Sequence, residues 1–339
     1  MRYIIIGAGA VGGAIGGRLF AAGHEVVLVA RGAHHAALRD GGLRLTVPDG
    51  SLTLPIPAVD RPEALELRPG DVLVMAVKTQ DTTGVLESWA GRPVAGGGTA
   101  CEELPLVCAQ NAVENERLAL RRFRHVYGMC VWLPATHLEP GKVAAFGSPL
   151  TGILHVGRYP SGTDRTAERI SADLETSAFL APVVPDVMRW KYAKLLANLA
   201  NSLEAVCGPV DGDDLLGLYR RTVAEGRAVL DAAGIAYTGE EEEKRVRGDR
   251  IRLLEVEGTE RGGGSSWQSL ARGTGSIEAD HLNGEITLLA RLHGTAAPVN
   301  ETLQRVANAF ARERRAPGSM PVPELLDLID RRDRAPDRS

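Results

Sequence analysis

The 339-residue sequence has few cysteines and no long apolar run, and these two absences exclude several classes of protein. Its four cysteines are scattered, without the CxxC spacing of structural zinc sites or the density of a disulfide framework. We therefore expect free, buried thiols in a reducing compartment and no metal site. No apolar run reaches the ~20 residues that a membrane-spanning helix needs, so no membrane association is expected.

The sequence also lacks a large excess of positive or of negative charge. The net charge is −4 and the isoelectric point is about 6.1, which indicates no general affinity for nucleic acid or for an anionic membrane. Residues 1–6 lead directly into a glycine-rich turn, so no secretory signal peptide is expected. The apolar and charged fractions, 44% and 24%, are those of an ordinary soluble protein, and we expect a cytoplasmic location.

The hydrophobic pattern that is present predicts an α/β domain followed by an all-α domain. A short apolar strand, a glycine turn, a helix and a second strand open the chain, as in a βαβ unit. Further strands are expected at 71–77, 104–109, 126–133 and 143–156, with a hairpin at 43–59. After Pro185 the periodicity becomes helical, at 186–205, 213–233, 240–257, 276–292 and 301–314. The predicted domains are a Rossmann-type dinucleotide-binding domain at 1–184 and a helical domain at 185–330, with a disordered tail at 331–339.

The glycine turn at residues 7–12 is the first candidate site. Gly7 permits the tight turn out of the strand, Gly9 lets backbone amides approach a pyrophosphate, and Gly12 lets the helix pack closely on the sheet. The N-terminus of the helix then faces the phosphates. The alternative is a glycine turn that binds nothing. The position between a strand and a helix favours a dinucleotide site made of Gly7, Ala8, Gly9, Ala10, Val11 and Gly12.

The end of the second strand predicts the nucleotide. An Asp or Glu there would bind the ribose 2′-hydroxyl of NAD, but the sequence has Ala30 and Arg31. Arg31 is suited to a bidentate pair with a 2′-phosphate, so NADP(H) is favoured over NAD(H). An ordinary surface arginine is the alternative. Lys78 and Asn111 also follow strands directly, where open α/β sheets bind ligands, although either is equally compatible with a solvated loop.

A polar row on a predicted helix is the second candidate site. Lys194, Asn198, Asn201 and Ser202 project from one helical face, in a segment that is otherwise apolar. They form either a substrate-facing row that contains a cationic acid or a stripe bonded to a neighbouring element. Glu278 lies at the start of a later predicted helix, where the ordinary role of an acid is to stabilise the helix dipole.

Taken together, these segments resemble the ketopantoate reductase family, also called the 2-dehydropantoate 2-reductases. The resemblance implies a Rossmann domain followed by a helical domain, with Lys194 as the general acid and Glu278 as its carboxylate partner. It implies substrate contacts from Asn111, Asn198 and Ser266, with Asn201 or Ser202 nearby. It places Lys78 near the nicotinamide side, adds Asn111 to the cofactor-binding residues, and suggests a homodimer. The matching segments are 7–12, Arg31, 77–78, 110–111, 194–198, 265–266, 278–280, 282–284, 293–294 and Pro298.

Three departures from the family pattern affect the substrate site. Ala112 stands where the family usually has glycine, Ser202 replaces a second helical asparagine, and Trp267 lies in an altered stretch after Ser266. The resemblance implies reduction of 2-dehydropantoate to pantoate with NADPH, a step toward pantothenate and coenzyme A. Reduction of another branched or bulky 2-oxo acid is the first alternative. A non-catalytic NADP-binding sensor is the second.

Overall fold

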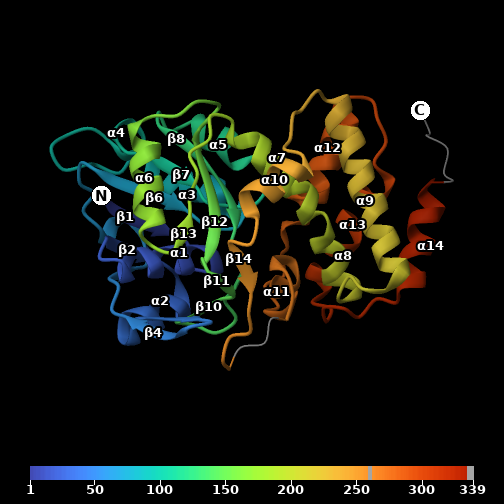
Figure 1. Ribbon diagram of the computed structural model, residues 1–339, viewed down its shortest axis with the longest axis horizontal. Helices are drawn as coiled ribbons and strands as arrows, with labels where there is room; N and C mark the ends of the chain where they lie inside the picture. The colour runs from blue at the N-terminus through green and yellow to red at the C-terminus, as the bar shows by residue number, and fades with distance from the viewer. Residues whose placement is uncertain (259–261, 334–339) are drawn as a thin grey trace. The chain divides into compact units, whose positions relative to one another are not determined.

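The computed structural model describes residues 1–258 and 262–333, and the chain forms two compact units (Figure 1). The first unit contains Met1–Lys191 and Thr238–Arg261, and the second contains Tyr192–Tyr237 and Gly262–Ser339. The predicted fold class is confirmed, because the first unit is built on a parallel sheet and the second is helical. The sequence pattern places one boundary near residue 184. The chain instead leaves the first unit within a helix and later returns to it for one segment.

The first unit has an eight-stranded sheet in the order β13-β12-β8-β7-β6-β1-β2-β5. Its five central strands are parallel, so their carboxyl ends meet at one edge. Side chains alternate between the two faces: Tyr3 and Ile5 join one apolar cluster, and Ile4 and Ile6 join the other. The five strands are β1 (Arg2–Ile6), β2 (Glu25–Val29), β6 (Asp71–Met75), β7 (Leu106–Cys108) and β8 (Val126–Trp132).

Three further strands, which are short or antiparallel, extend this sheet. Four other strands form a separate, smaller sheet. β5 (Ala58–Val59) pairs with β2, and β12 (Gly152–Arg158) runs antiparallel to β8 and pairs with β13 (Phe179–Leu180). The predicted hairpin is confirmed by the antiparallel pair β3 (Leu43–Val47) and β4 (Gly50–Leu54). With β9 (Ala135–Thr136) and β10 (Lys142–Ala145), these strands form a four-stranded sheet.

Helices cover both faces of the large sheet. Residues of α1 (Ala10–Ala21) and α6 (Arg165–Glu175) join one apolar cluster, and residues of α3 (Thr82–Ala90), α4 (Ala100–Glu103) and α5 (Asn115–Leu120) join the other. Helix α1 packs against the strands through glycines, which leave no room there for a side chain. A Cβ on Gly16 would lie 2.9 Å from Leu28 Cδ2. The unit also contains α2 (Gly32–Gly41), α10 (Glu240–Arg247) and the 3₁₀ turns η1 (Pro62–Ala64) and η2 (Thr79–Asp81).

The second unit is a helical bundle around Leu203, Leu303 and Phe310, each with no exposed surface. Helix α7 (Val187–Asn198) enters it from the first unit. The remaining elements are α8 (Ala200–Cys207), α9 (Gly212–Ala232), α11 (Ser265–Ala271), η3 (Glu278–His281), α12 (Asn283–Leu292), α13 (Pro298–Glu313) and α14 (Val322–Asp333). Among the described residues, no helix combines the length and the apolarity that a membrane crossing requires.

Three predicted helices differ from the observed ones. The helix expected at 186–205 is divided at Leu199, whose N–H is shared between the carbonyls of Leu195 and Leu196. The helix expected at 276–292 opens with the 3₁₀ turn η3 and continues as α12. The helix expected at 240–257 ends at Gly248, whose φ of +44° terminates α10.

The segment after Gly248 is a strand and not a helix. β14 (Ile251–Leu253) pairs antiparallel with β11 (Gly147–Pro149). A segment about a hundred residues further along the chain thus belongs to the first unit. At the C-terminus, α14 continues to Asp333, so the expected disordered tail does not begin at residue 331. Residues 334–339 of that tail lie outside the described residues.

His155 on β12 is a histidine buried in an apolar setting. Its side chain is 2% exposed, and its ring stacks on Trp190 with the centroids 3.8 Å apart. Neither ring nitrogen has a hydrogen-bond partner within the part of the chain that the structure describes. Burial lowers the pKa of His155 to about 4. Folding therefore keeps this imidazole neutral at pH values where an unfolded chain would protonate it.

We expect His155→Phe to reduce the acid sensitivity of the fold. The folded-state pKa lies below the unfolded value of about 6.5, so the unfolded chain binds more protons as the pH falls from 6.5 to 4. The wild type should lose up to about 3 kcal/mol across that window through this group, and the variant should not. Urea unfolding at pH 7 and pH 4.5 measures the difference, with the exposed His293→Phe as a control. Equal pH dependence in all three proteins would contradict the assignment.

Candidate active site

Four predicted residues or segments meet at the carboxyl edge of the parallel sheet in the first unit. The glycine turn follows β1, Arg31 follows β2, Lys78 follows β6 and Asn111 follows β7. These strands are neighbours in the order β7-β6-β1-β2 and run in the same direction. Their ends therefore surround one stretch of the edge, where an open α/β sheet binds its ligand.

The glycine turn has the geometry of a dinucleotide cradle. Gly7 has φ +100°, and a Cβ there would lie 2.8 Å from the backbone nitrogen of Val77. A Cβ on Gly12 would lie 2.1 Å from the carbonyl oxygen of Gly7, so this position has room only for hydrogen. Gly9 differs, because the nearest atom to its Cβ would be His137 Nδ1 at 3.9 Å. The open side of the turn is therefore at Gly9, at the start of α1.

The start of α1 fits a pyrophosphate. Gly9 is the N-cap and supplies no side-chain cap, and no acid lies in the first turn. The first N–H groups of a helix have no partner within it, and the helix dipole favours an anion there. Ala8, Ala10 and Val11 line this turn through their backbones, and the Ala8 N–H is bonded to the Val29 carbonyl at 3.2 Å.

Arg31 is the exposed N-cap residue of α2, one turn before His34. His34 bonds the glycine turn to a distant loop. Its Nδ1 accepts from the N–H of Gly141 at 2.9 Å, so its Nε2 carries the proton and donates to the Ala8 carbonyl at 2.8 Å. Burial lowers the pKa of His34, which keeps this neutral form. No local sequence pattern indicates the role of His34, because its partner Gly141 is 107 residues away.

A buried polar network supports Lys78 and Asn111. Gln110 Nε2 donates to the Val77 carbonyl and to Thr82 Oγ1, both at 2.9 Å. Thr82 Oγ1 donates to Asn115 Oδ1 at 2.7 Å, and Asn115 Nδ2 donates to the Asn111 carbonyl at 2.9 Å. The loops after β6 and β7 are thereby tied to each other through side chains that water does not reach.

A buried ion pair lies beneath the same loop. Lys191 Nζ donates to Glu116 Oε1 and to the Gln110 carbonyl, with the Lys191 and Glu116 side chains 2% and 0% exposed. Burial raises the pKa of Glu116, and the ammonium of Lys191 opposes that rise. Neither residue is among those predicted from the sequence. Lys191 precedes Lys194 by one helical turn of α7, but no local pattern links it to Glu116, 75 residues away.

In the second unit, two predicted substrate residues have unused hydrogen-bonding capacity. Asn198 is 5% exposed and Ser266 is 1% exposed. Asn198 Nδ2 and Ser266 Oγ have no hydrogen-bond partner among residues 1–258 and 262–333. Leaving such buried groups unpaired costs free energy, so these two atoms are suited to a polar ligand. Lys194 on α7 is half-buried, and Glu278, the first residue of η3, is 3% exposed.

The structure separates the two remaining helical candidates. Ser202 is fully buried, and its hydroxyl donates to Asn283 Oδ1 at 2.6 Å. Asn283 Nδ2 in turn donates to the Leu199 carbonyl and to Asn300 Oδ1. Ser202 therefore belongs to a structural network of the bundle. Asn201 is half-buried. Its Oδ1 would lie 3.3 Å from a Cβ on Gly264, so Asn201 lies beside the start of α11.

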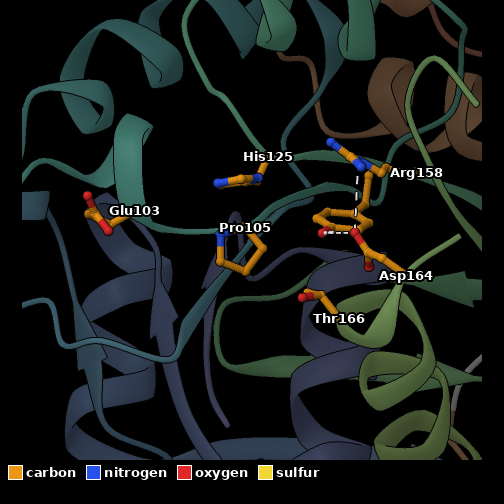
Figure 2. Close-up of a pocket in the computed structure, with 7 residues that line it drawn as sticks. Glu103, Pro105, His125, Arg158, Asp164 and Thr166 are labelled. Atoms are coloured by element: carbon orange, nitrogen blue, oxygen red, sulfur yellow. Dashed lines mark hydrogen bonds and ion pairs between the residues drawn. The ribbon is translucent and has the colours of Figure 1, made fainter. Parts of the chain in front are cut away.

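Figure 2 shows a pocket at the opposite edge of the sheet, where β7 and β8 begin. Three of its polar side chains interact with one another. Tyr127 Oη donates to Asp164 Oδ2 at 2.8 Å, Asp164 caps α6, and Arg158 Nε lies 3.9 Å from the same carboxylate. Burial raises the pKa of Tyr127 to about 12. We do not place the chemistry here. The pocket is lined by Glu103, Pro105, His125, Tyr127, Arg158, Asp164 and Thr166.

Comparison with known proteins matches both parts of the chain to one family. The model described as "Ketopantoate reductase PanE/ApbA" covers residues 3–161, and "Ketopantoate reductase PanE/ApbA C terminal" covers residues 186–311. A 2-dehydropantoate 2-reductase from Pyrococcus horikoshii is 27% identical over 91% of this chain and 97% of its own length.

Two solved structures have the same fold. A PanE/ApbA family ketopantoate reductase from Ralstonia eutropha JMP134 is 26% identical with a TM-score of 0.75, covering 93% of this chain and 99% of the other. The ternary structure of D-mandelate dehydrogenase with NADH and anilino(oxo)acetate is 20% identical with a TM-score of 0.77, at the same coverage of both chains. The two family models together span most of the sequence, and the chain therefore belongs to the ketopantoate reductase family of oxidoreductases.

Proposed function

We propose that this protein reduces 2-dehydropantoate to pantoate with NADPH, a step toward pantothenate and coenzyme A. The observation that carries the proposal is the pair of unpartnered buried polar atoms, Asn198 Nδ2 and Ser266 Oγ, in the unit that holds Lys194 and Glu278. A carboxylate or hydroxyl of the substrate would form hydrogen bonds with these two atoms. The names of the curated relatives support the same reaction.

The residue types fit ketone reduction. NADPH, when bound, supplies the hydride. The ketone oxygen becomes negative as it is reduced, and the ammonium of Lys194 stabilises that charge and donates a proton to the oxygen. The carboxylate of Glu278 keeps Lys194 protonated or orients it. Asn111, Asn198 and Ser266 hold the substrate's carboxylate and hydroxyl, with Asn201 in an accessory position.

The preference for NADPH rests on Arg31 and on the absence of an acid at the end of β2. Gly7 to Gly12 hold the pyrophosphate, Arg31 pairs with the 2′-phosphate, Lys78 lies on the nicotinamide side, and Asn111 also contacts the cofactor. The D-mandelate dehydrogenase neighbour was solved with NADH, so the test of this preference compares NADPH with NADH.

We expect Arg31→Ala to raise the Kd of NADPH about 10- to 100-fold and to change the Kd of NADH less than twofold. The reason is that a charge-assisted bidentate pair to the 2′-phosphate contributes roughly 1.5–3 kcal/mol, and NADH lacks that phosphate. Fluorescence titration with each nucleotide measures both constants. Arg39→Ala, an exposed arginine on the same helix, is the matched control. Equal losses for NADPH and NADH would remove Arg31 from the phosphate site.

A second candidate substrate is a bulkier 2-oxo acid. The D-mandelate dehydrogenase neighbour supports it, and so does Trp267, whose indole lies against Gly262 and Gly263 in the altered stretch. NADPH oxidation against 2-dehydropantoate, phenylglyoxylate and aliphatic 2-oxo acids discriminates the two. Turnover of 2-dehydropantoate at the highest kcat/KM supports the first proposal. Turnover of another acid alone supports the second, and tight NADPH binding without turnover supports a sensor.

We propose a cytoplasmic location, where the four free thiols stay reduced. We also propose a homodimer, on the likeness to the family. Light scattering coupled to size-exclusion chromatography gives the mass in solution directly.

A further inference from the structure

The turn between β7 and α5 holds a strained residue. Ala112 has φ +66°, in the left-handed region where a side chain with a Cβ is disfavoured. It is 4% exposed and directly follows Gln110 and Asn111. Strain of this kind persists only where surrounding contacts hold the backbone in place, and it gathers at functional sites.

Both carbonyls before Ala112 are held from outside the turn. Lys191 Nζ donates to the Gln110 carbonyl at 3.1 Å. Asn115 Nδ2 donates to the Asn111 carbonyl at 2.9 Å, and Thr79 Oγ1 donates to the same oxygen at 3.5 Å. The backbone of Asn111 is thus fixed, while none of the hydrogen bonds of the described segments involves its half-buried side chain. The side chain is left for a ligand.

Stability alone does not account for the ion pair that supplies one of these contacts. Lys191 and Glu116 are both excluded from water, and taking two charges out of water often costs more than their attraction returns. Glu116 Oε2 has no hydrogen-bond partner in the described part of the chain, so its desolvation is not offset there. A well-packed apolar pair would avoid this cost, but it would not hold the Gln110 carbonyl.

We propose that Lys191 and Glu116 are positioning residues that keep the strained turn at residues 110–112 in the conformation that presents Asn111 to the 2-oxo acid. This inference rests on the proposed function. Without the pair, Ala112 relaxes out of the left-handed region and Asn111 loses its orientation. The glycine turn at Gly7 is held by other contacts, so cofactor binding is largely retained.

The first test replaces the pair by an apolar one, Glu116→Met together with Lys191→Met, because removing one partner alone leaves an uncompensated buried charge. We expect the KM for 2-dehydropantoate to rise at least 10-fold, and the Kd of NADPH to change at most threefold. A KM within twofold of the wild type would overturn the proposal. If the double variant does not fold, Lys191→Arg replaces it. The planar guanidinium keeps the charge, but its rigid fork directs its donors differently from the compact ammonium, so the same rise in KM is expected.

A rescue experiment separates positioning from general stability. Adding Ala112→Gly to the double variant should lower the KM at least threefold. Glycine adopts φ +66° without strain, so the turn no longer depends on the Lys191–Glu116 pair. Ala178→Gly is the matched control, since Ala178 has φ +61° in the same unit, far along the chain from this turn. It should raise the melting temperature similarly and leave the KM unchanged. Recovery by both glycines, or by neither, would overturn the proposal.

Amide hydrogen exchange distinguishes a failure of this inference from a failure of the proposed function. If the wild type reduces no 2-oxo acid, the proposed function fails, and exchange becomes the readout. The amides of residues 111–115 should exchange at least 10-fold faster in the double variant than in the wild type, and Ala112→Gly should reverse part of that increase. Unchanged exchange in the double variant would overturn the positioning role.

Discussion

Lys194→Ala is expected to lower kcat by a factor of about 10² to 10⁴ and to leave the Kd of NADPH within threefold of the wild type. The factor is that of general acid catalysis by a positioned side chain. The helical position of Lys194 is half-buried, so alanine is accommodated there without a steric clash. Stopped-flow oxidation of NADPH with saturating 2-oxo acid measures the chemical step. Near-normal turnover would refute the assignment of Lys194 as the acid.

Two controls separate the charge of Lys194 from its proton. Lys194→Arg keeps the positive charge, but a guanidinium does not release a proton at neutral pH, so kcat should remain low. Added methylamine should restore part of the activity of Lys194→Ala, because the amine enters the space left by the side chain, and should have no effect on Lys194→Arg. Lys244→Ala on the exposed helix α10 controls for loss of a lysine elsewhere.

The second large effect is expected at the glycine turn, where Gly12→Ala and Gly9→Ala should fail in different ways. A Cβ on Gly12 would lie 2.1 Å from the Gly7 carbonyl and 2.9 Å from Ile5 Cγ2, so the helix must move off the sheet. We expect a loss of at least about 2 kcal/mol in the free energy of unfolding. Urea denaturation measures it.

Gly9→Ala is the matched partner. The nearest atom outside the turn to a Cβ there would be His137 Nδ1 at 3.9 Å, and φ is −72°, so the fold accommodates alanine. The methyl group instead occupies the side from which a pyrophosphate would approach. The unfolding free energy should stay within about 0.5 kcal/mol of the wild type, and the Kd of NADPH should rise at least 10-fold. A stable Gly12→Ala protein, or Gly9→Ala with unaltered NADPH affinity, would contradict this division of roles.

The features that the sequence predicts well are those set by local pattern and by the rules of parallel sheets. The glycine turn, Arg31, Lys78 and Asn111 all follow apolar runs, and parallel strands necessarily end at one edge. The helical character of the second unit also follows from periodicity. In each case a short stretch of chain contains all the information that the prediction uses.

What the sequence does not predict depends on partners that are distant along the chain. The sequence shows Lys191 only as a polar residue of a helix. Its role depends on the contact with Glu116, which lies 75 residues earlier. His34 acquires its role only from Gly141. Ser202 and Asn201 share one helical pattern, and only the position of Asn283 assigns Ser202 to the bundle. The segment at 251–253 forms a strand because its backbone pairs with β11.

The return of Thr238–Arg261 to the first unit limits how this protein can be divided. Ending the chain at Lys191 would remove β14, the strand that pairs with β11, and Glu242, which pairs with Arg189 at 3.0 Å. The nucleotide-binding half is therefore not obtained by truncation at a single point. A minimal version needs a short linker in place of residues 192–237, so that the severed ends rejoin and the returning segment is retained.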